Sequence, residues 1–500
     1  MRMTRIQGTC LMALVVLAGV GANAGDTRLL EAIKTGDHAG IVTLLEQHVA
    51  VNASQADGTT PLHWAVRGDD LELVRLLLRA GAKPNAANRY GVTPLSLAAL
   101  NRSPAIVHAL LDAGADPNAP LPDGQTILMT AARAGHADVV QALLDFGAYA
   151  DAREALAGET ALMWAAHENH SDAARALVAY GADINARSNA LKFSQFKFGD
   201  GIVARPTVLP KGGWTPLMYA ARQNAIAAAK ALADAGADLN LTDPDGTSAL
   251  VLAIINAHYD LAGVLIDKGA DTNVADVSGM PALYAAADMH TLDETVGRPN
   301  PKPHSALDSP DIIKALLADG ANPNARLKAP ILDRVHNDGD ANLGEGSTPL
   351  MRAAKDADIE VMRLLLDHGA DLTLANAKGT TALMYAASRA PGFRGTPNRG
   401  SEQDALLAIN LCLERGAAIN AIDRTGQSAM HLAAAQAEDS IVKLLAAKGA
   451  NLQLKDQRGR TPLDVALAGG RGRSASARED KAALLRQLMA GSAPPQASLP

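Results

Sequence analysis

Residues 57–86, DGTTPLHWAVRGDDLELVRLLLRAGAKPNA, contain one complete copy of the pattern that decides the fold of this chain. The opening predicts a helix start at Thr60, because a threonine side chain can cap a helix whose first residue is proline. The leucine-rich stretch that follows predicts a second helix, which ends at Gly81, where a left-handed backbone is needed. A two-helix unit of this kind cannot bury its own apolar face, so it must stack on neighbouring copies.

The same pattern recurs along the chain. The opening phrase occurs eleven times, and six of the ten intervals between its leading glycines are 33 residues long. Those glycines are Gly58, Gly91, Gly124, Gly158, Gly213, Gly246, Gly279, Gly346, Gly379, Gly426 and Gly459. A second series is predicted to end the second helices: Gly81, Gly114, Gly147, Gly181, Gly236, Gly269, Gly320, Gly369, Gly416 and Gly449. A fixed period of this length is typical of a solenoid.

This pattern resembles the ankyrin repeat over residues 26–491, and in its loops the chain resembles exported bacterial ankyrin-repeat proteins that carry insertions. The resemblance implies an all-α ankyrin-repeat solenoid, with layers of two helices and a hairpin connector. His63 and His431 keep the histidine that follows leucine in the family. Other copies carry methionine there and must satisfy the neighbouring backbone differently: Met129, Met163, Met218, Met351 and Met384.

The period also predicts the domain organisation. It consists of a signal peptide (1–24), an N-terminal capping repeat (25–56), ten repeats (57–457), a C-terminal capping repeat (458–491) and a tail (492–500). Insertions are expected near 190–212, 289–308, 328–344 and 389–402, with 22 extra residues after Gly181, 18 before Gly320 and 16 after it. In the last copy, GGRGRSASARED (469–480) is predicted to separate the two helices.

The first 24 residues have the pattern of a signal peptide. Arg2 and Arg5 precede an apolar run that ends at Ala22-Asn23-Ala24, a small-residue cleavage site. We therefore expect a periplasmic or secreted protein, with no membrane span after cleavage. Only Cys412 then remains of the two cysteines, and its apolar surroundings predict a buried side chain.

The net charge argues against a nucleic-acid partner. It is −7 for the whole chain and becomes −9 when Arg2 and Arg5 are removed with the leader. Phosphate backbones attract basic proteins, so we expect no nucleic acid among the partners. The partner expected instead is another protein, of the cell envelope, bound by a monomer.

Aromatic residues are concentrated in the insertions. Phe193, Phe196, Phe198 and Phe393 are four of only five phenylalanines. Two interpretations stay open for Phe193 to Phe198: they form an interface, or they pack onto the solenoid.

The resemblance to ankyrin repeats implies that a partner contacts connector tips and first-helix residues. Together with the phenylalanine cluster, these positions give the predicted partner-binding residues Tyr90, Arg133, His167, Glu168, Phe193, Phe196, Phe198, Trp214, Arg222, Asp288, Lys355 and Arg389. Large residues two positions after the first-helix leucine are expected to serve packing instead: Trp64, Trp164, Tyr219 and Tyr385.

The sequence shows no catalytic constellation. His167 and His170 have the spacing of a ligand pair but lack a third ligand, and residues 333–345 miss the spacing of a calcium loop. We therefore predict no catalysis, no cofactor and no metal. The alternative is a metal or enzymatic site assembled from the loops, with His290, Asp293, His304, His336, Asp338 and Asp340 as candidate ligands.

Overall fold

The structure is a computed structural model, which describes residues 26–121, 124–190, 212–290, 306–331, 343–388, 401–436, 438–468 and 475–491. Within these ranges all regular elements are α-helices, and extended backbone occurs only as isolated bridges between connector residues. The predicted all-α class is therefore confirmed. The leader, the Phe193, Phe196 and Phe198 cluster, and Arg389 lie outside the described residues.

The chain divides into two compact units. The first comprises residues up to Thr130 together with Asp145–Ala148, and the second comprises Ala131–Leu144 and everything from Tyr149 onward. The helices of the first unit are α1 (Arg28–Thr35), α2 (His38–Glu46), α3 (Pro61–Arg67), α4 (Leu71–Arg79), α5 (Pro94–Leu100) and α6 (Pro104–Asp112). Two helices, α7 (Ile127–Ala134) and α8 (Ala137–Asp145), contribute residues to both units.

The second unit contains the remaining helices. The first helices of its repeats are α9 (Ala161–His167), α11 (Pro216–Arg222), α13 (Ala249–Ile255), α15 (Ala282–His290), α17 (Pro349–Lys355), α19 (Ala382–Ala387), α21 (Ala429–Gln436) and α23 (Pro462–Ala468). The second helices are α10 (Ser171–Ala179), α12 (Ile226–Asp234), α14 (Tyr259–Asp267), α16 (Ser309–Ala318), α18 (Ile359–Asp367), α20 (Glu402–Glu414), α22 (Asp439–Ala447) and α24 (Ala475–Gly491).

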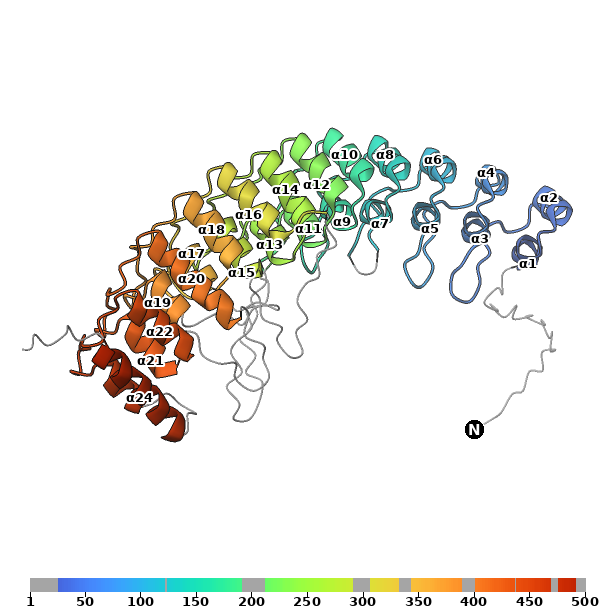
Figure 1. Ribbon diagram of the computed structural model, residues 1–500. Helices are drawn as coiled ribbons and strands as arrows, with labels where there is room; N and C mark the ends of the chain where they lie inside the picture. Colours follow the sequence, from blue (N-terminus) through green and yellow to red (C-terminus); the bar gives the residue numbers. More distant parts are fainter. Residues whose placement is uncertain are drawn as a thin grey trace, which may run out of the picture. The chain divides into compact units, whose positions relative to one another are not determined.

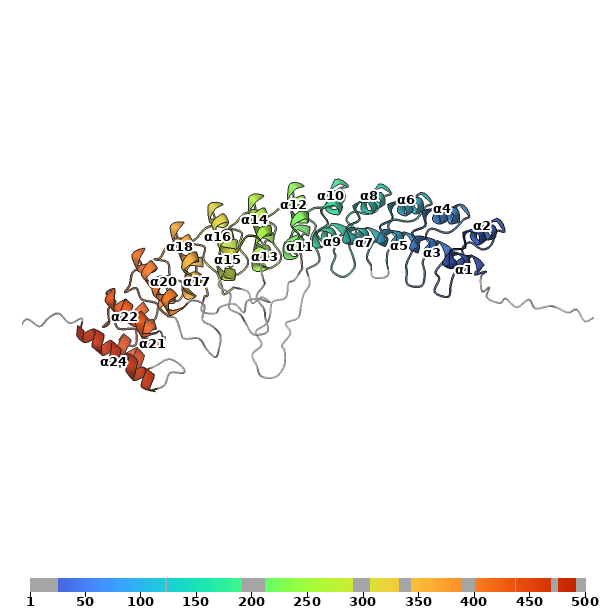
Figure 2. The ribbon, with the colours of Figure 1, turned by 45° about the vertical axis from the view of Figure 1, so that its right-hand side comes forward.

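Within each unit the helices form two rows (Figure 1 and Figure 2). In the second unit, α9 packs on α11 and α11 on α13, while α10 packs on α12 and α12 on α14. The first helices can approach closely because small residues face the neighbouring layer. The Ala165–Ala166 and Ala220–Ala221 pairs, for example, are completely buried. Burial of these apolar faces between layers is the main source of stability in such a stack.

The helix ends have the chemistry that the sequence predicts. Thr93 Oγ1 accepts a hydrogen bond of 3.2 Å from the Ser96 amide, and Thr215 and Thr348 cap their helices in the same way at 3.4 Å. All ten glycines that follow the second helices have φ between 83° and 92°, so the predicted left-handed conformation is confirmed. One helix start was predicted wrongly. α24 begins at Ala475 and not at Lys481, because the alanines and charged residues of 475–480 favour helix.

A series of asparagine side chains, here called the asparagine seam, joins successive connectors. The Asn85 side chain donates to Gly114 O at 2.8 Å and accepts from the Asp116 amide at 2.8 Å. Asn52 makes the equivalent pair of bonds to Gly81 and Lys83. Asn273 and Asn324 repeat the arrangement in the second unit. Each seam residue satisfies backbone groups at a helix end that would otherwise lack partners.

The seam also locates the insertions. The donor bond spans 29 residues from Asn85, but 47 residues from Asn273 and 45 from Asn324. The differences of 18 and 16 residues equal the predicted extra lengths on either side of Gly320. The Asn185 carbonyl group accepts from Asp238 across 53 residues instead of 31, a difference of 22. The bonded connectors thus keep the same contacts where the sequence between them is longer.

The two histidine copies differ from the methionine copies as predicted. His63 Nδ1 accepts a 3.2 Å hydrogen bond from the Thr60 amide, so its proton lies on Nε2, which donates to Val92 O of the next repeat at 2.9 Å. Burial lowers the pKa of His63, so the ring stays neutral. In a methionine copy, the Thr160 amide contacts the Met163 sulfur at 3.5 Å, and methionine has no second polar atom to reach the next repeat.

Candidate functional site

The first helices α9 and α11 present rings and polar groups on one face. Trp164 and Tyr219 each lie two positions after the first-helix leucine, and His167 and Arg222 lie three positions further on. Residues three apart on a helix are neighbours on its surface. The register therefore places a ring and a polar or cationic side chain together in each of two successive repeats.

A pocket of about 190 Å³ lies between these two helices. Its lining residues are Glu159, Met163, Trp164, His167, Trp214, Tyr219, Arg222 and Gln223. Trp214 comes from the connector that precedes α11 and is only 4% exposed. The pocket therefore combines two helices and one connector, and it contains two of the three tryptophans of the chain.

Hydrogen bonds tie the two repeats together across this pocket. The Tyr219 hydroxyl donates to Glu159 Oε1 at 2.7 Å. The Gln223 side-chain amide donates to His167 Nε2 at 2.8 Å, which leaves the His167 proton on Nδ1, 3.2 Å from Glu168 Oε1. Burial raises the pKa of Tyr219 above its ordinary value, so the hydroxyl remains a neutral donor. The two carboxylates of the site are thus engaged by Tyr219 and His167.

The rings pack edge to face. The centroids of Trp214 and Tyr219 are 5.5 Å apart, and those of Trp164 and His167 are 6.1 Å apart. His167 also lies 6.4 Å from Tyr219, so the ring contacts continue from one repeat to the next. Such contacts hold aromatic side chains in fixed orientations and provide apolar surface beside polar edges.

Two arginines stack on the tryptophans. The guanidinium carbon of Arg222 lies 4.9 Å from the ring centre of Trp214, and that of Arg133 lies 5.4 Å from the ring centre of Trp164. Both are cation–π distances. Neither guanidinium has a hydrogen-bond acceptor or an ion-pair partner among the described residues, and the buried indole N–H groups of Trp164 and Trp214 also lack acceptors there. The site therefore contains several N–H donors, here called uncommitted donors, that have no hydrogen-bond acceptor among the described residues.

Further along the second unit, the equivalent positions of two first helices carry oppositely charged side chains in place of the rings. Arg352 on α17 takes the position of Trp164 and Tyr219, and Asp288 on α15 takes the position of His167 and Arg222. These two side chains form a buried ion pair of 2.6 Å, and Asp356 contacts the same guanidinium. Burial alone would lower the pKa of Arg352, but the two carboxylates raise it above its ordinary value.

The structure brings five of the predicted partner-binding residues to the α9–α11 pocket or its edge. They are Arg133, His167, Glu168, Trp214 and Arg222. Others lie elsewhere: Tyr90 belongs to the first unit, where it is 57% exposed and stacks with Arg89, whereas Asp288 is buried and Lys355 is half-buried.

Trp164 and Tyr219, which the sequence assigns to packing, also line the pocket. Their side chains are half-buried, so each ring packs against the repeats and still forms part of the wall. In the sequence, Trp164 lies three residues before His167, and Tyr219 lies three residues before Arg222. This spacing was the signal that could have shown that the rings share a surface with the polar residues.

The described part of the chain contains no cluster of three histidine, cysteine or acidic side chains placed to hold a metal ion. Of the candidate ligands for a loop-assembled site, only His290 is described, and its Nδ1 contacts the carboxylate of Asp358. Cys412 is completely buried, as predicted, and burial raises the pKa of its thiol to about 12. Within the described segments, no helix combines the length and the apolar character that crossing a bilayer requires.

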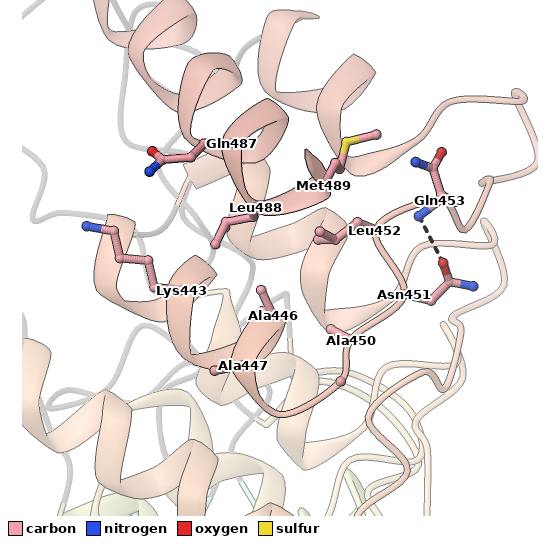
Figure 3. Close-up of a pocket in the computed structure, with 11 residues that line it drawn as sticks. Lys443, Ala446, Ala447, Ala450, Asn451, Leu452, Gln453, Gln487, Leu488 and Met489 are labelled. Atoms are coloured by element: carbon pink, nitrogen blue, oxygen red, sulfur yellow. Dashed lines mark hydrogen bonds between the residues drawn. The ribbon is translucent and has the colours of Figure 1, made fainter. Parts of the chain in front are cut away.

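A larger cavity, of about 760 Å³, lies between α22, the connector after it and α24 (Figure 3). Its walls are mixed, with Ala446, Leu452 and Leu488 beside the polar side chains of Asn451 and Gln487. Lys443 is its one charged lining residue. This cavity has none of the aromatic rings and arginines that characterise the α9–α11 pocket, which is therefore the stronger candidate site.

Comparison with known proteins establishes the class of this chain. A family model described as ankyrin repeats, in three copies, matches residues 7–88, 29–120, 95–188, 200–276, 217–296, 305–393 and 401–478. These overlapping matches cover most of the sequence, so the chain belongs to the ankyrin-repeat family. Ankyrin repeats imply a protein-interaction scaffold with a protein partner, and the family is generally non-catalytic.

Individual relatives match only in part. The transient receptor potential cation channel subfamily A member 1 homolog of Caenorhabditis elegans is 35% identical over 125 residues, which are 25% of this chain and 9% of the relative. The human neurogenic locus notch homolog protein 1 is 35% identical over 99 residues, 20% of this chain and 4% of the relative. The crystal structure of the human ASB11 ankyrin repeat domain is 28% identical, with 46% of this chain and 92% of that chain covered and a TM-score of 0.36.

Proposed function

We propose that this protein is an exported scaffold that binds another protein of the cell envelope and performs no chemistry itself. The observation that carries the proposal is the α9–α11 pocket, where rings and uncommitted donors meet on the first-helix face. Aromatic side chains and arginines are enriched where proteins bind one another with high affinity. The insertion between α10 and α11 adjoins this pocket in sequence and belongs to the same proposed contact surface.

Export is the part of the proposal that rests on the leader. The basic start, the apolar run and Ala22-Asn23-Ala24 support cleavage before Gly25. We expect the mature chain to be a periplasmic or secreted monomer. Amino-terminal sequencing of the protein recovered from a periplasmic fraction should begin at Gly25, and a chain that retains Met1 in the cytoplasm would contradict export.

Affinity capture tests the binding function. The mature chain should retain a protein from a periplasmic extract, and so should a control with the exposed α18 residue changed, Arg363→Gln. The double variant His167→Ala and Gln223→Ala removes the bridge between α9 and α11 and should retain less of that protein while its melting temperature changes little. A chain that lacks residues 192–201 tests the adjoining insertion. Equal recovery with all variants would refute a contact at this surface.

Metal analysis tests the alternative, a loop-assembled site. The scaffold proposal expects the purified mature chain to contain no stoichiometric metal. A metal at one equivalent that is lost in the variant His290→Ala would favour the alternative.

A further inference from the structure

We infer that the α9–α11 pocket binds an acidic segment of the partner, whose carboxylates are held by Arg222 on α11 and by Arg133 on α7, the first helix on the other side of α9. This inference rests on the proposed function, because it names the chemistry of the ligand at the same site. It begins with Arg222. Its guanidinium carbon lies 4.9 Å from the ring centre of Trp214, and its N–H groups have no acceptor among the described residues. A planar fork of donors held in this way suits a carboxylate.

Arg133, two layers earlier on α7, also lies over a tryptophan, in its case Trp164 of the next repeat. It stacks on Trp164 at 5.4 Å, is exposed, and has no ion-pair partner in the described part of the chain. Each arginine is therefore presented over a tryptophan ring, from α7 on one side of α9 and from α11 on the other. Contact with a ring restricts each arginine side chain, so less conformational entropy is lost on binding.

The acidic groups of the site are already engaged. Glu159 accepts the hydrogen bond of Tyr219, and Glu168 accepts from His167. The charge that still lacks a partner is therefore positive. The indole N–H groups of Trp164 and Trp214 add two donors that are shielded from water and lack acceptors within the described ranges. A ligand that enters the pocket can satisfy these groups only with acceptor atoms.

The adjoining sequence has the same sign of charge. The insertion 191–211 leaves the fold at Ala190 and returns at Gly212, two residues before Trp214. It carries four basic residues and one acid: Lys192, Lys197, Arg205, Lys211 and Asp200. In the sequence, this segment has an excess of positive charge in a chain whose net charge is −7, and an acidic ligand complements that charge.

A basic ligand fits the site less well. Aromatic rings can hold a cation, but Arg133 and Arg222 already lie over the two tryptophan rings. A second cation there would meet like charge at short range. The arrangement therefore selects against a lysine or arginine of the partner.

Nuclear magnetic resonance of the tryptophan indoles tests the inference. The full mature chain contains three tryptophans, so it should give three indole N–H signals. Trp64 also has cations over its ring, but its N–H already donates to Gln55 Oε1 at 3.2 Å, so its signal is the internal reference. The probes are acetylated and amidated tetrapeptides of glutamate, of glutamine and of lysine, added at constant ionic strength up to about 10 mM, a range suited to millimolar affinity. We expect the glutamate peptide alone to shift Trp164 and Trp214 saturably.

The double variant Arg133→Gln and Arg222→Gln should bind the glutamate peptide at least about tenfold more weakly, a change of about 1.4 kcal/mol. The matched variant Arg363→Gln should bind it as the parent does. The inference is overturned if the glutamate peptide causes no shift, if glutamine or lysine peptides act equally, or if the double variant binds unchanged. Indole shifts on deletion of residues 192–201 without any peptide would instead assign the pocket to this chain's own insertion.

These outcomes separate the two proposals. If a periplasmic partner is captured but the glutamate peptide does not bind, the scaffold function stands and the acidic ligand is wrong. If the peptide binds but no protein is captured, the pocket chemistry stands and the scaffold function is contradicted.

Discussion

Arg352 Nε donates a hydrogen bond of 2.6 Å to Asp288 Oδ1, and this ion pair joins α15 of one repeat to α17 of the next. Arg352 is 7% exposed and Asp288 is 5% exposed. At the equivalent register, α9 and α11 place His167 beside Tyr219. Equivalent positions on the first helices therefore form ring contacts between one pair of repeats and a buried ion pair between another pair.

Removal of the arginine alone should be strongly destabilising. Arg352→Met leaves Asp288 and Asp356 in a buried region without their shared cation, and the expected loss is about 3–5 kcal/mol of unfolding free energy. Hydrogen exchange of α15 and α17 amides measures the effect locally. The control Arg363→Met, at an exposed position of α18, should stay within about 0.5 kcal/mol. A double variant, Asp288→Ala with Arg352→Leu, should lose less than the single change; an equal loss would contradict this account of the pair.

His63 should make the first unit sensitive to acid. Its folded pKa is lowered, so the unfolded chain binds more protons, and stability should fall as the pH drops below the ordinary histidine value of about 6.5. His63→Met places here the residue that other copies use. It should cost about 1 kcal/mol near pH 8, through the lost bond to Val92, and it should weaken the dependence on pH. Urea unfolding at several pH values measures both effects, and parallel curves for the two proteins would refute the histidine's role.

The asparagine seam can be tested in graded steps. Asn85→Ala removes the bonds to Gly114 O and to the Asp116 amide, with an expected loss of about 1–2 kcal/mol in the first unit. Asn85→Asp keeps the acceptor and loses the donor, so its effect should be intermediate. Thermal unfolding provides the ranking. If the aspartate variant were as unstable as the alanine variant, the acceptor bond would contribute nothing.

Two glycines with different backbone conformations form a matched pair. Gly81 has φ +87°, and a β-carbon added there would meet no atom within 4 Å, so Gly81→Ala should lose about 1–2 kcal/mol through backbone strain alone. Gly68 has φ −79°, which alanine adopts readily. Gly68→Ala should therefore be neutral or slightly stabilising. Chemical denaturation measures the free energy of unfolding of both variants. Equal losses in the two variants would contradict the assigned role of the left-handed backbone at Gly81.

Cys412 should be unreactive while the protein is folded. The thiol is completely buried on α20 and its pKa is raised to about 12, so almost no accessible thiolate exists at pH 8. A thiol reagent should modify the native mature chain about a hundredfold more slowly than the chain in urea. Rapid labelling under native conditions would show that α20 opens locally.

Much of this architecture was readable from the sequence, because glycine spacing reports backbone conformation directly. Gly81 and its counterparts fixed the helix ends, and the irregular intervals gave the insertion lengths. The pairing of Asp288 with Arg352 was hidden, since 64 residues separate them and the intervening insertions obscure their shared register. Trp214 was predicted as a partner-binding residue, yet it is only 4% exposed and packs against Tyr219.

The asparagine bond to the following glycine carbonyl is 2.8 Å at a sequence separation of 29 residues and 2.9 Å at a separation of 45. Loop closure costs free energy only slowly with length, so a lengthened segment leaves the bonded backbone where it was. Ancestral chains could thus acquire or discard loop residues at these junctions while every repeat kept its register. The same junctions are natural acceptor points for grafted recognition peptides.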